Sequence, residues 1–245
     1  MILLGAGMFG TVAVFPYILS IQGDALIELP LSLPIVLILS LVQTTILLSV
    51  AIFGGLYLAK KVGFGAPLLS SWVAKQPVQE QLKSKGWLSV KLGVLAGVLI
   101  IGFDYVFLQF MEPIAVEGVP LWQGFLGSFY GGIVEEILLR LFLVTLIVWL
   151  IWKFSKTDDG KPTATSIWIA IITAAIIFGI GHLPATALLT TITPIVIVRA
   201  ILLNGIGGVI FGWLYWKKGL ESAMIAHFTA DLVLLVVFPL MLKII

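Results

Sequence analysis

The chain contains no cysteine. This absence excludes disulfides, thiolate metal sites and a cysteine nucleophile. Charged residues are also scarce, at 11% of 245 residues, whereas hydrophobic residues make up 60% and the mean hydropathy is +1.18. A soluble surface needs a much higher charge density, so the composition predicts an integral membrane protein.

Long polar blocks are missing as well, and we find no internal repeat and no low-complexity tract. We therefore expect a single integral-membrane domain over residues 1–245. The net charge of +2 comes mostly from lysines in short loops, and no basic stripe is present, so nucleic acid is not an expected partner. The expected location is a membrane crossed several times, the plasma membrane if the source is prokaryotic.

Seven apolar runs are long enough to cross a bilayer, which takes about 20 residues. They are 2–21, 33–59, 88–110, 121–152, 164–183, 186–216 and 220–242. This pattern predicts an all-α bundle of about seven to eight transmembrane helices. The run 121–152 is too long for one perpendicular crossing and is expected to break near Gly131-Gly132, while 186–216 is expected to tilt or kink around Pro194. The first run lacks a basic start and a cleavage site, so we expect it to be retained.

The loop charges predict the topology. Acidic residues occupy the loops that alternate with the basic ones, at Asp24, Glu28, Glu112 and Glu117. Lysines follow the second, fourth and sixth runs, at Lys60, Lys61, Lys75, Lys83, Lys85, Lys153, Lys156, Lys161, Lys217 and Lys218. The positive-inside rule then places the amino terminus in the cytoplasm. The polar linker 60–86 is expected to form an interfacial amphipathic helix.

Few ionisable residues lie inside the apolar runs, and each costs at least about 2.5–3.5 kcal/mol at the bilayer centre. They include both arginines and both histidines of the chain, together with four acidic residues. These eight are Asp104, Glu135, Glu136, Arg140, His182, Arg199, His227 and Asp231. Such residues face a bundle interior and pair with one another, so we expect a shared buried polar cavity.

Two adjacent carboxylates begin the most charged of these runs. Glu136 and Arg140 are four residues apart and share a helical face, where an ion pair can form. Glu135 points about 100° away from Glu136 on an α-helix, which leaves it free to act as a general base in the cavity. Alternatively, all three charges form one network that holds helices together.

The two histidines have both chemical and purely structural interpretations. His182 ends an apolar run in Phe178-x-x-x-His182 and could simply pack or form hydrogen bonds there. His227 and Asp231 share a helical face, where the carboxylate could orient the imidazole, join it in binding a metal, or only satisfy its hydrogen bonding. Other hydrolase signatures are absent: the sequence has no G-x-S-x-G, no H-E-x-x-H, and no rhomboid-like or aspartyl intramembrane motif.

Three ordered motifs carry a family resemblance: Glu-Glu-x-x-x-Arg at 135–140, Phe-x-x-x-His at 178–182 and His-x-x-x-Asp at 227–231. Together they resemble the CPBP family of intramembrane proteases, which includes the type II CAAX prenyl endopeptidases, or Ras-converting enzymes, and the bacterial Abi proteins. The resemblance covers roughly residues 120–240. It divides the domain into N-terminal helices with a connector, 1–118, and a catalytic core, 119–245.

The resemblance implies an intramembrane endopeptidase that cuts near the C-terminus of a membrane-associated, and in the CAAX enzymes prenylated, protein. Glu135 and His182 would activate water, and His227 with residue 231 would hold the oxyanion. Glu136, Arg140 and Phe178 would support them. This chain departs from the commoner asparagine by carrying Asp231, and an ionised aspartate cannot donate. Asp231 must therefore be protonated, position His227, or bind a metal.

We expect no cofactor, because the motifs lack the tight helical spacing that preorganises two zinc ligands, although histidines and carboxylates could bind zinc. Membrane lipid and a peptide or prenylated protein are the expected partners, and the oligomeric state stays open. At a helical rise of about 1.5 Å per residue, Glu135 and His182 lie about 27 Å from the lysine-bearing ends of their runs. His227 lies only about 12 Å from the lysine-bearing end of its own run. A shared site therefore requires tilted or broken helices, or reversed topology.

Two other functions fit buried ionisable residues. One is a proton-coupled transporter, in which Glu, Asp, Arg and His commonly line the pathway. The other is a catalytically silent scaffold or immunity-type membrane protein that keeps the polar centre for packing. The ordered motif set favours the protease.

Overall fold

The computed structural model describes residues 1–27, 30–111 and 118–242. The expected loop charges at Glu28, Glu112 and Glu117 lie outside these residues, as does the side chain of Asp24. Within the described ranges the chain is helical, and its only extended pairing is an isolated bridge between Lys156 and Pro162.

The first half of the chain contains α1 (Ile2–Ile27), α2 (Leu33–Val62), α3 (Pro67–Val73), α4 (Gln79–Phe107) and the 3-10 turn η1 (Leu108–Phe110). The second half begins with α5 (Leu121–Phe129), the π-helical η2 (Tyr130–Glu135) and η3 (Ile137–Val144), and α6 (Thr145–Trp152). It ends with α7 (Ala164–Gly181), α8 (Leu183–Ala187), α9 (Pro194–Lys218), α10 (Leu220–Leu232), the π-helical η4 (Val233–Val237) and α11 (Phe238–Leu242).

Six helices in the described ranges are long and apolar enough to cross a membrane. A further crossing was expected over 121–152, where α5, η2, η3 and α6 follow one another as one helical run. The protein is thus a multi-pass helical membrane bundle, as the composition predicted. The expected break near Gly131-Gly132 is wrong, because the chain changes there from α-helical to π-helical hydrogen bonding without leaving the helix.

The expected kink at Pro194 is also wrong, because Pro194 starts a helix. Proline suits the first helical position, where the missing N–H needs no partner. The Thr193 hydroxyl caps α9 by accepting from the Val196 amide at 3.4 Å. The preceding residues 188–193 form a linker, and α8 follows α7 directly. The linker 60–86 contains the short helix α3 and the first turns of α4 in place of one interfacial helix.

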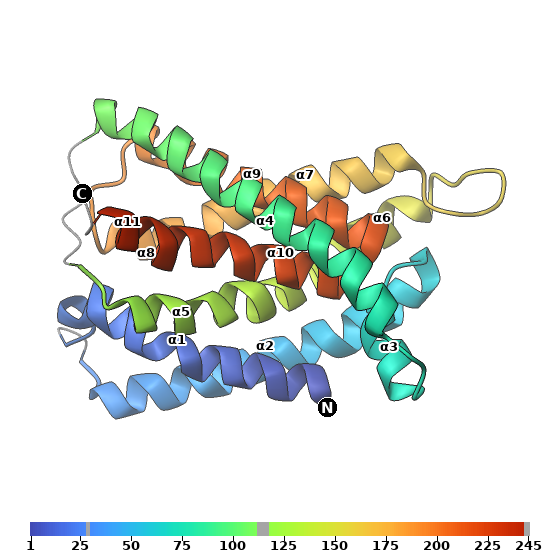
Figure 1. The fold of residues 1–245 in the computed structure, drawn as a ribbon, viewed down its shortest axis with the longest axis horizontal. Coiled ribbons are helices and arrows are strands. Elements are labelled where there is room, and N and C mark those ends of the chain that lie inside the picture. Colours follow the sequence, from blue (N-terminus) through green and yellow to red (C-terminus); the bar gives the residue numbers. More distant parts are fainter. Residues whose placement is uncertain (28–29, 112–117, 243–245) are drawn as a thin grey trace.

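Helix α10 lies at the centre of the bundle and contacts α4, α9, α5 and η2 (Figure 1). Glycine permits a close approach of α4 to α10, because a Cβ at Gly93 of α4 would overlap the carbonyl oxygen of Ala226. Residues from helices far apart in the sequence are thereby brought against one face of α10.

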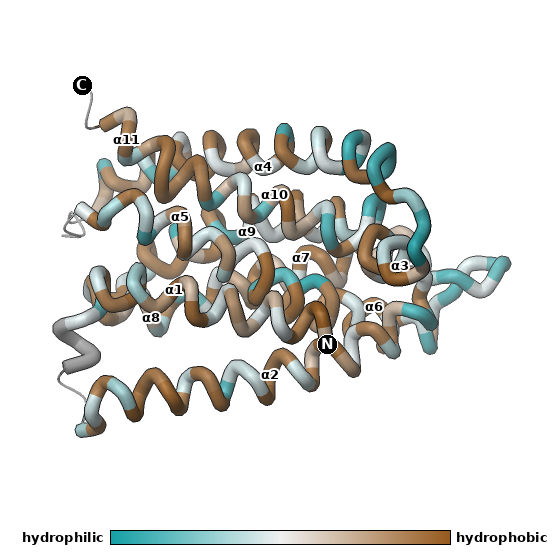
Figure 2. The backbone as a smooth tube through the Cα atoms, turned by 60° about the horizontal axis from the view of Figure 1, so that its bottom comes forward, coloured by the Kyte–Doolittle hydropathy of each residue, from teal (hydrophilic) through white to brown (hydrophobic). Residues whose placement is uncertain are grey.

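The lysine-rich segments gather at one end of the bundle, together with the amino terminus. These segments are α3 with the start of α4, the 153–163 loop, and the α9–α10 junction, and their hydrophilic residues stand out in Figure 2. At this end α6 and α7 extend beyond the α9–α10 junction (Figure 1). Helix ends are therefore staggered, which removes the conflict between the expected depths of Glu135, His182 and His227.

Candidate active site

The two adjacent carboxylates lie where the helical run is π-helical. Glu135 ends η2, Glu136 follows it, and η3 begins at Ile137. A π-helix has more residues per turn than an α-helix, so neighbouring side chains diverge less. Both carboxylates reach the same imidazole, that of His227, instead of pointing to different surroundings.

Glu136 forms the expected ion pair with Arg140, with 2.8 Å between Oε1 and Nη1, and both side chains are buried. The same carboxylate oxygen accepts a hydrogen bond from Nδ1 of His227 at 2.7 Å. Sequence reasoning missed this second contact and assigned Glu136 only to the ion pair. Glu136 therefore also fixes the orientation of the His227 ring.

The other nitrogen of His227, Nε2, faces two further carboxylates. It lies 3.5 Å from Oε2 of Glu135 and 3.7 Å from Oδ1 of Asp231. Phe211 stacks on the imidazole with ring centroids 4.6 Å apart. The 3.7 Å separation between His227 and Asp231 is too long for a hydrogen bond.

His182 follows α7, and its Nδ1 lies 2.9 Å from the carbonyl oxygen of Phe178. Because a carbonyl only accepts, Nδ1 carries the proton of this bond, and Nε2 of the neutral ring is an acceptor. The Phe178 ring contacts His182 edge to face at 4.7 Å and lies 5.8 Å from His227. Phe178 thus contacts His182 through both its carbonyl oxygen and its ring, and His227 through its ring alone.

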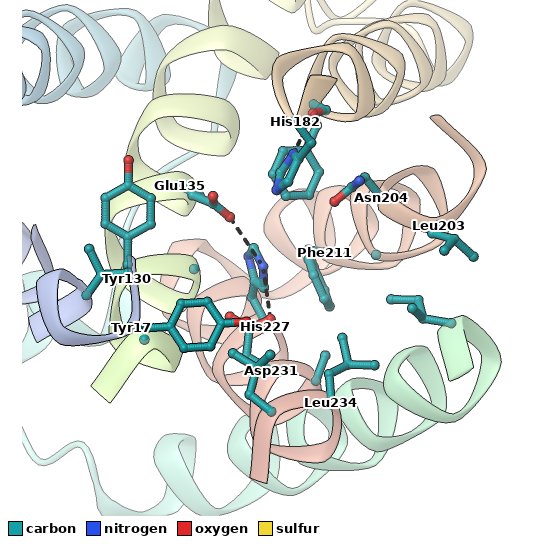
Figure 3. Close-up of a pocket in the computed structure, with 18 residues that line it drawn as sticks. Tyr17, Tyr130, Glu135, His182, Leu203, Asn204, Phe211, His227, Asp231 and Leu234 are labelled. Carbon is teal, nitrogen blue, oxygen red and sulfur yellow. Dashed lines mark hydrogen bonds and ion pairs between the residues drawn. The ribbon is translucent and has the colours of Figure 1, made fainter. Parts of the chain in front are cut away.

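The ionisable side chains of the site surround a cavity of about 340 Å³. Glu135, His182, His227 and Asp231 all line it, and their side chains converge on it in Figure 3.

Three polar residues of the lining were not anticipated: Tyr17, Tyr130 and Asn204. Asn204 was detectable, since an amide inside an apolar run is a polar signal of the kind that identified the other residues. The two tyrosines carry no such signal, because tyrosine is common in membrane helices.

The placement of the His, Asp and Glu side chains bears on whether the site could hold a metal ion. Among residues 1–27, 30–111 and 118–242, no group of three or more His, Asp or Glu side chains is arranged to hold one. We therefore assign zinc no catalytic step.

Comparison with known families gives one match. Residues 117–233 match the family described as type II CAAX prenyl endopeptidase Rce1-like. This segment is Rce1-like. No curated protein and no solved structure matches the chain significantly.

The Rce1-like segment contains Glu135, His182, His227 and Asp231, and its family implies protease activity in a membrane. Its bounds lie inside the expected core 119–245 except for two residues at the start. The cavity extends beyond the segment, because Tyr17 of α1 and Ile100 of α4 also line it.

Gly131 provides a direct test of the site geometry. A Cβ at this position would overlap Oδ2 of Asp231 and lie 3.0 Å from Nε2 of His227. We expect Gly131→Ala to displace both side chains and to lower peptide cleavage at least about 100-fold, the lower end for loss of acid–base catalysis.

A matched control is Gly205→Ala in α9, where an added Cβ meets nothing within 4 Å. It should keep activity and gain up to about 1 kcal/mol of stability from helix propensity. The measurements are initial cleavage rates and thermal unfolding of both variants. Full activity of Gly131→Ala would show that His227 and Asp231 need not hold these positions.

Proposed function

We propose that the chain is an intramembrane endopeptidase that hydrolyses a peptide bond near the C-terminus of a membrane-associated substrate, of which a prenylated CAAX protein is the first candidate. The observation that supports this most is the convergence of Glu135, His182 and His227 on one cavity, with His227 Nε2 3.5 Å from Glu135. The match of residues 117–233 to the Rce1-like family independently favours the same reaction class.

In this proposal Glu135 is the general base. Its carboxylate accepts a proton from a water molecule, while Nε2 of His182 accepts a hydrogen bond from the other hydrogen of that water and orients the attack. The water oxygen bonds to the scissile carbonyl carbon. The C–N bond then breaks, and the proton held by Glu135 passes to the leaving amine.

His227 holds the oxyanion that forms in this attack. With Nδ1–H donated to Glu136, a protonated ring still has Nε2–H available toward the cavity. Glu135, Glu136 and Asp231 surround the ring with negative charge, which stabilises its protonated form. One such donor typically contributes about 2.7–4 kcal/mol to the barrier reduction. We assign Asp231 the role of stabilising protonated His227, and not that of binding the oxyanion.

The remaining walls of the cavity suit an apolar peptide. Five aliphatic side chains also line it: Val14, Ile100, Leu203, Leu234 and Leu235. Aliphatic substrate residues would bury their side chains against this surface, at about 25 cal/mol per Å² of area removed from water.

The experiment is cleavage of a farnesylated CAAX peptide by the purified chain in liposomes, with products identified by mass spectrometry. We expect release of the three terminal residues, loss of the reaction in His182→Ala and His227→Ala, and survival after exhaustive chelation. Absence of cleavage of this peptide and of a general intramembrane substrate, together with proton flux across the liposomes, would overturn the proposal in favour of transport.

A further inference from the structure

A second cavity, of about 370 Å³, lies at the lysine-rich end of the bundle. It is formed by the turn between α2 and α3, the α9–α10 junction and the start of α4. Lys85, Lys217, Lys218 and the hydroxyl-bearing Ser70 line it. It shares no lining residue with the active-site cavity.

The three ammonium groups leave this cavity positively charged. No carboxylate of the described residues lies within ion-pair distance of Lys85, Lys217 or Lys218. Glu221 offsets part of the Lys85 charge; its Oε1 accepts a hydrogen bond from the Leu69 amide at 2.7 Å, and its Oε2 is buried without a hydrogen-bond partner. At least two positive charges therefore remain for an anion.

The cavity also lies at the end of the bundle that carries most of the tryptophans. Tryptophan is enriched where a membrane protein meets the interface, and here it accompanies the lysines. Lys217 lies over the Trp216 ring at 3.4 Å, and Lys153 over Trp149 at 3.9 Å. Seven of the eight tryptophans belong to the lysine-rich ends of their helices: Trp72, Trp87, Trp149, Trp152, Trp168, Trp213 and Trp216.

We propose that this cavity binds the phosphate of an anionic phospholipid. Lysines at the membrane surface attract anionic lipids, and a volume of about 370 Å³ is in the range of ligand pockets. The Ser70 hydroxyl adds a neutral donor for a phosphate oxygen.

The bound lipid would connect two parts of the fold. Its cavity lies between the α2–α3 turn and the start of α10, where the Leu220 amide donates to the Gly65 carbonyl at 3.0 Å. His227 follows on the same helix, seven residues after Leu220. Occupancy therefore stabilises the attachment of the helix that carries His227.

The test is native mass spectrometry of the full chain in neutral detergent, titrated with dioleoylphosphatidylglycerol, dioleoylphosphatidylcholine or inorganic phosphate. We expect tight binding of the anionic lipid only. Lys85→Gln and Lys218→Gln should each weaken it about fivefold, which corresponds to about 1 kcal/mol per lysine. The matched controls Lys153→Gln and Lys156→Gln, whose lysines stack on tryptophans outside the cavity, should bind as the parent does.

Three results would overturn the proposal. These are equal binding of both lipids, equal weakening by the control variants, or full occupancy by inorganic phosphate with no added effect of lipid. Thermal unfolding in phosphatidylcholine micelles establishes that each variant is folded. If Lys85→Gln does not fold, Lys217→Gln takes its place in the binding measurement. Because binding is measured without substrate, this test is independent of whether the chain cleaves CAAX peptides.

Discussion

Glu135→Gln should abolish most peptide cleavage, with kcat lowered about 10²- to 10⁴-fold, because a neutral amide cannot take a proton from water. The substitution keeps the size of the side chain. Glu135 is partly exposed to the cavity, at 20%, and makes no hydrogen bond within the described residues that the change would break. Unfolding temperature should therefore stay close to that of the parent. The measurements are single-turnover rates with a farnesylated peptide and thermal unfolding in the same micelles.

Glu80→Gln is the matched control, because Glu80 is exposed in the first turn of α4 and outside the active-site cavity. It should leave kcat unchanged. A Glu135→Gln enzyme that retains kcat within roughly a factor of three, well below the range for general-base loss, would remove Glu135 from the mechanism.

Arg140→Met should destabilise the fold by about 3–5 kcal/mol, because it leaves the Glu136 carboxylate buried without its counter-charge. Both side chains of the pair are almost completely buried, at 0% and 2% exposure. The double variant Glu136→Gln/Arg140→Met should regain most of this stability, since no isolated charge remains. Its activity should stay low, because an amide supports a protonated His227 less than a carboxylate does. Equilibrium unfolding in mixed micelles measures the first effect and peptide cleavage the second.

Arg199→Met supplies the matched control for the buried pair. Arg199 binds Asp104 at 2.6 Å between α4 and α9, but these side chains are 20% and 30% exposed. Because both side chains are less buried than those of Glu136 and Arg140, we expect loss of this pair to cost less, about 1 kcal/mol. If Arg140→Met cost no more than Arg199→Met, or if the double variant were as unstable as the single one, burial of the charge would not be the cause.

The fold class could be predicted because bilayer crossing imposes a length and a composition on every helix. Within the described residues the expected runs correspond to helices or to one helical run. The errors fall where local hydrogen bonding decides, at Gly131-Gly132 and at Pro194. A π-helix and a helix start leave almost the same apolar pattern as a break or a kink, so periodicity cannot separate them.

In the active site, too, some features could be predicted from the sequence and others could not. The sequence identified Glu135, His182, His227 and Asp231, because ionisable residues in apolar runs are costly and must pair. It also identified the ion pair of Glu136 with Arg140, which depends only on four-residue spacing.

By itself, then, the sequence determined a multi-pass helical bundle, most residues of its polar centre and one ion pair within a single helix. It wrongly placed Asp104 and Arg199 in that centre, because these two residues pair with each other and do not line the cavity. Only the tertiary structure decided that Glu136 also binds His227, that α1 contributes Tyr17 to the cavity, and that three lysines converge on a second one. The reason is physical. Composition and local spacing act along one segment, whereas these contacts join residues from different helices, and their positions depend on close packing and on the staggered ends of the bundle.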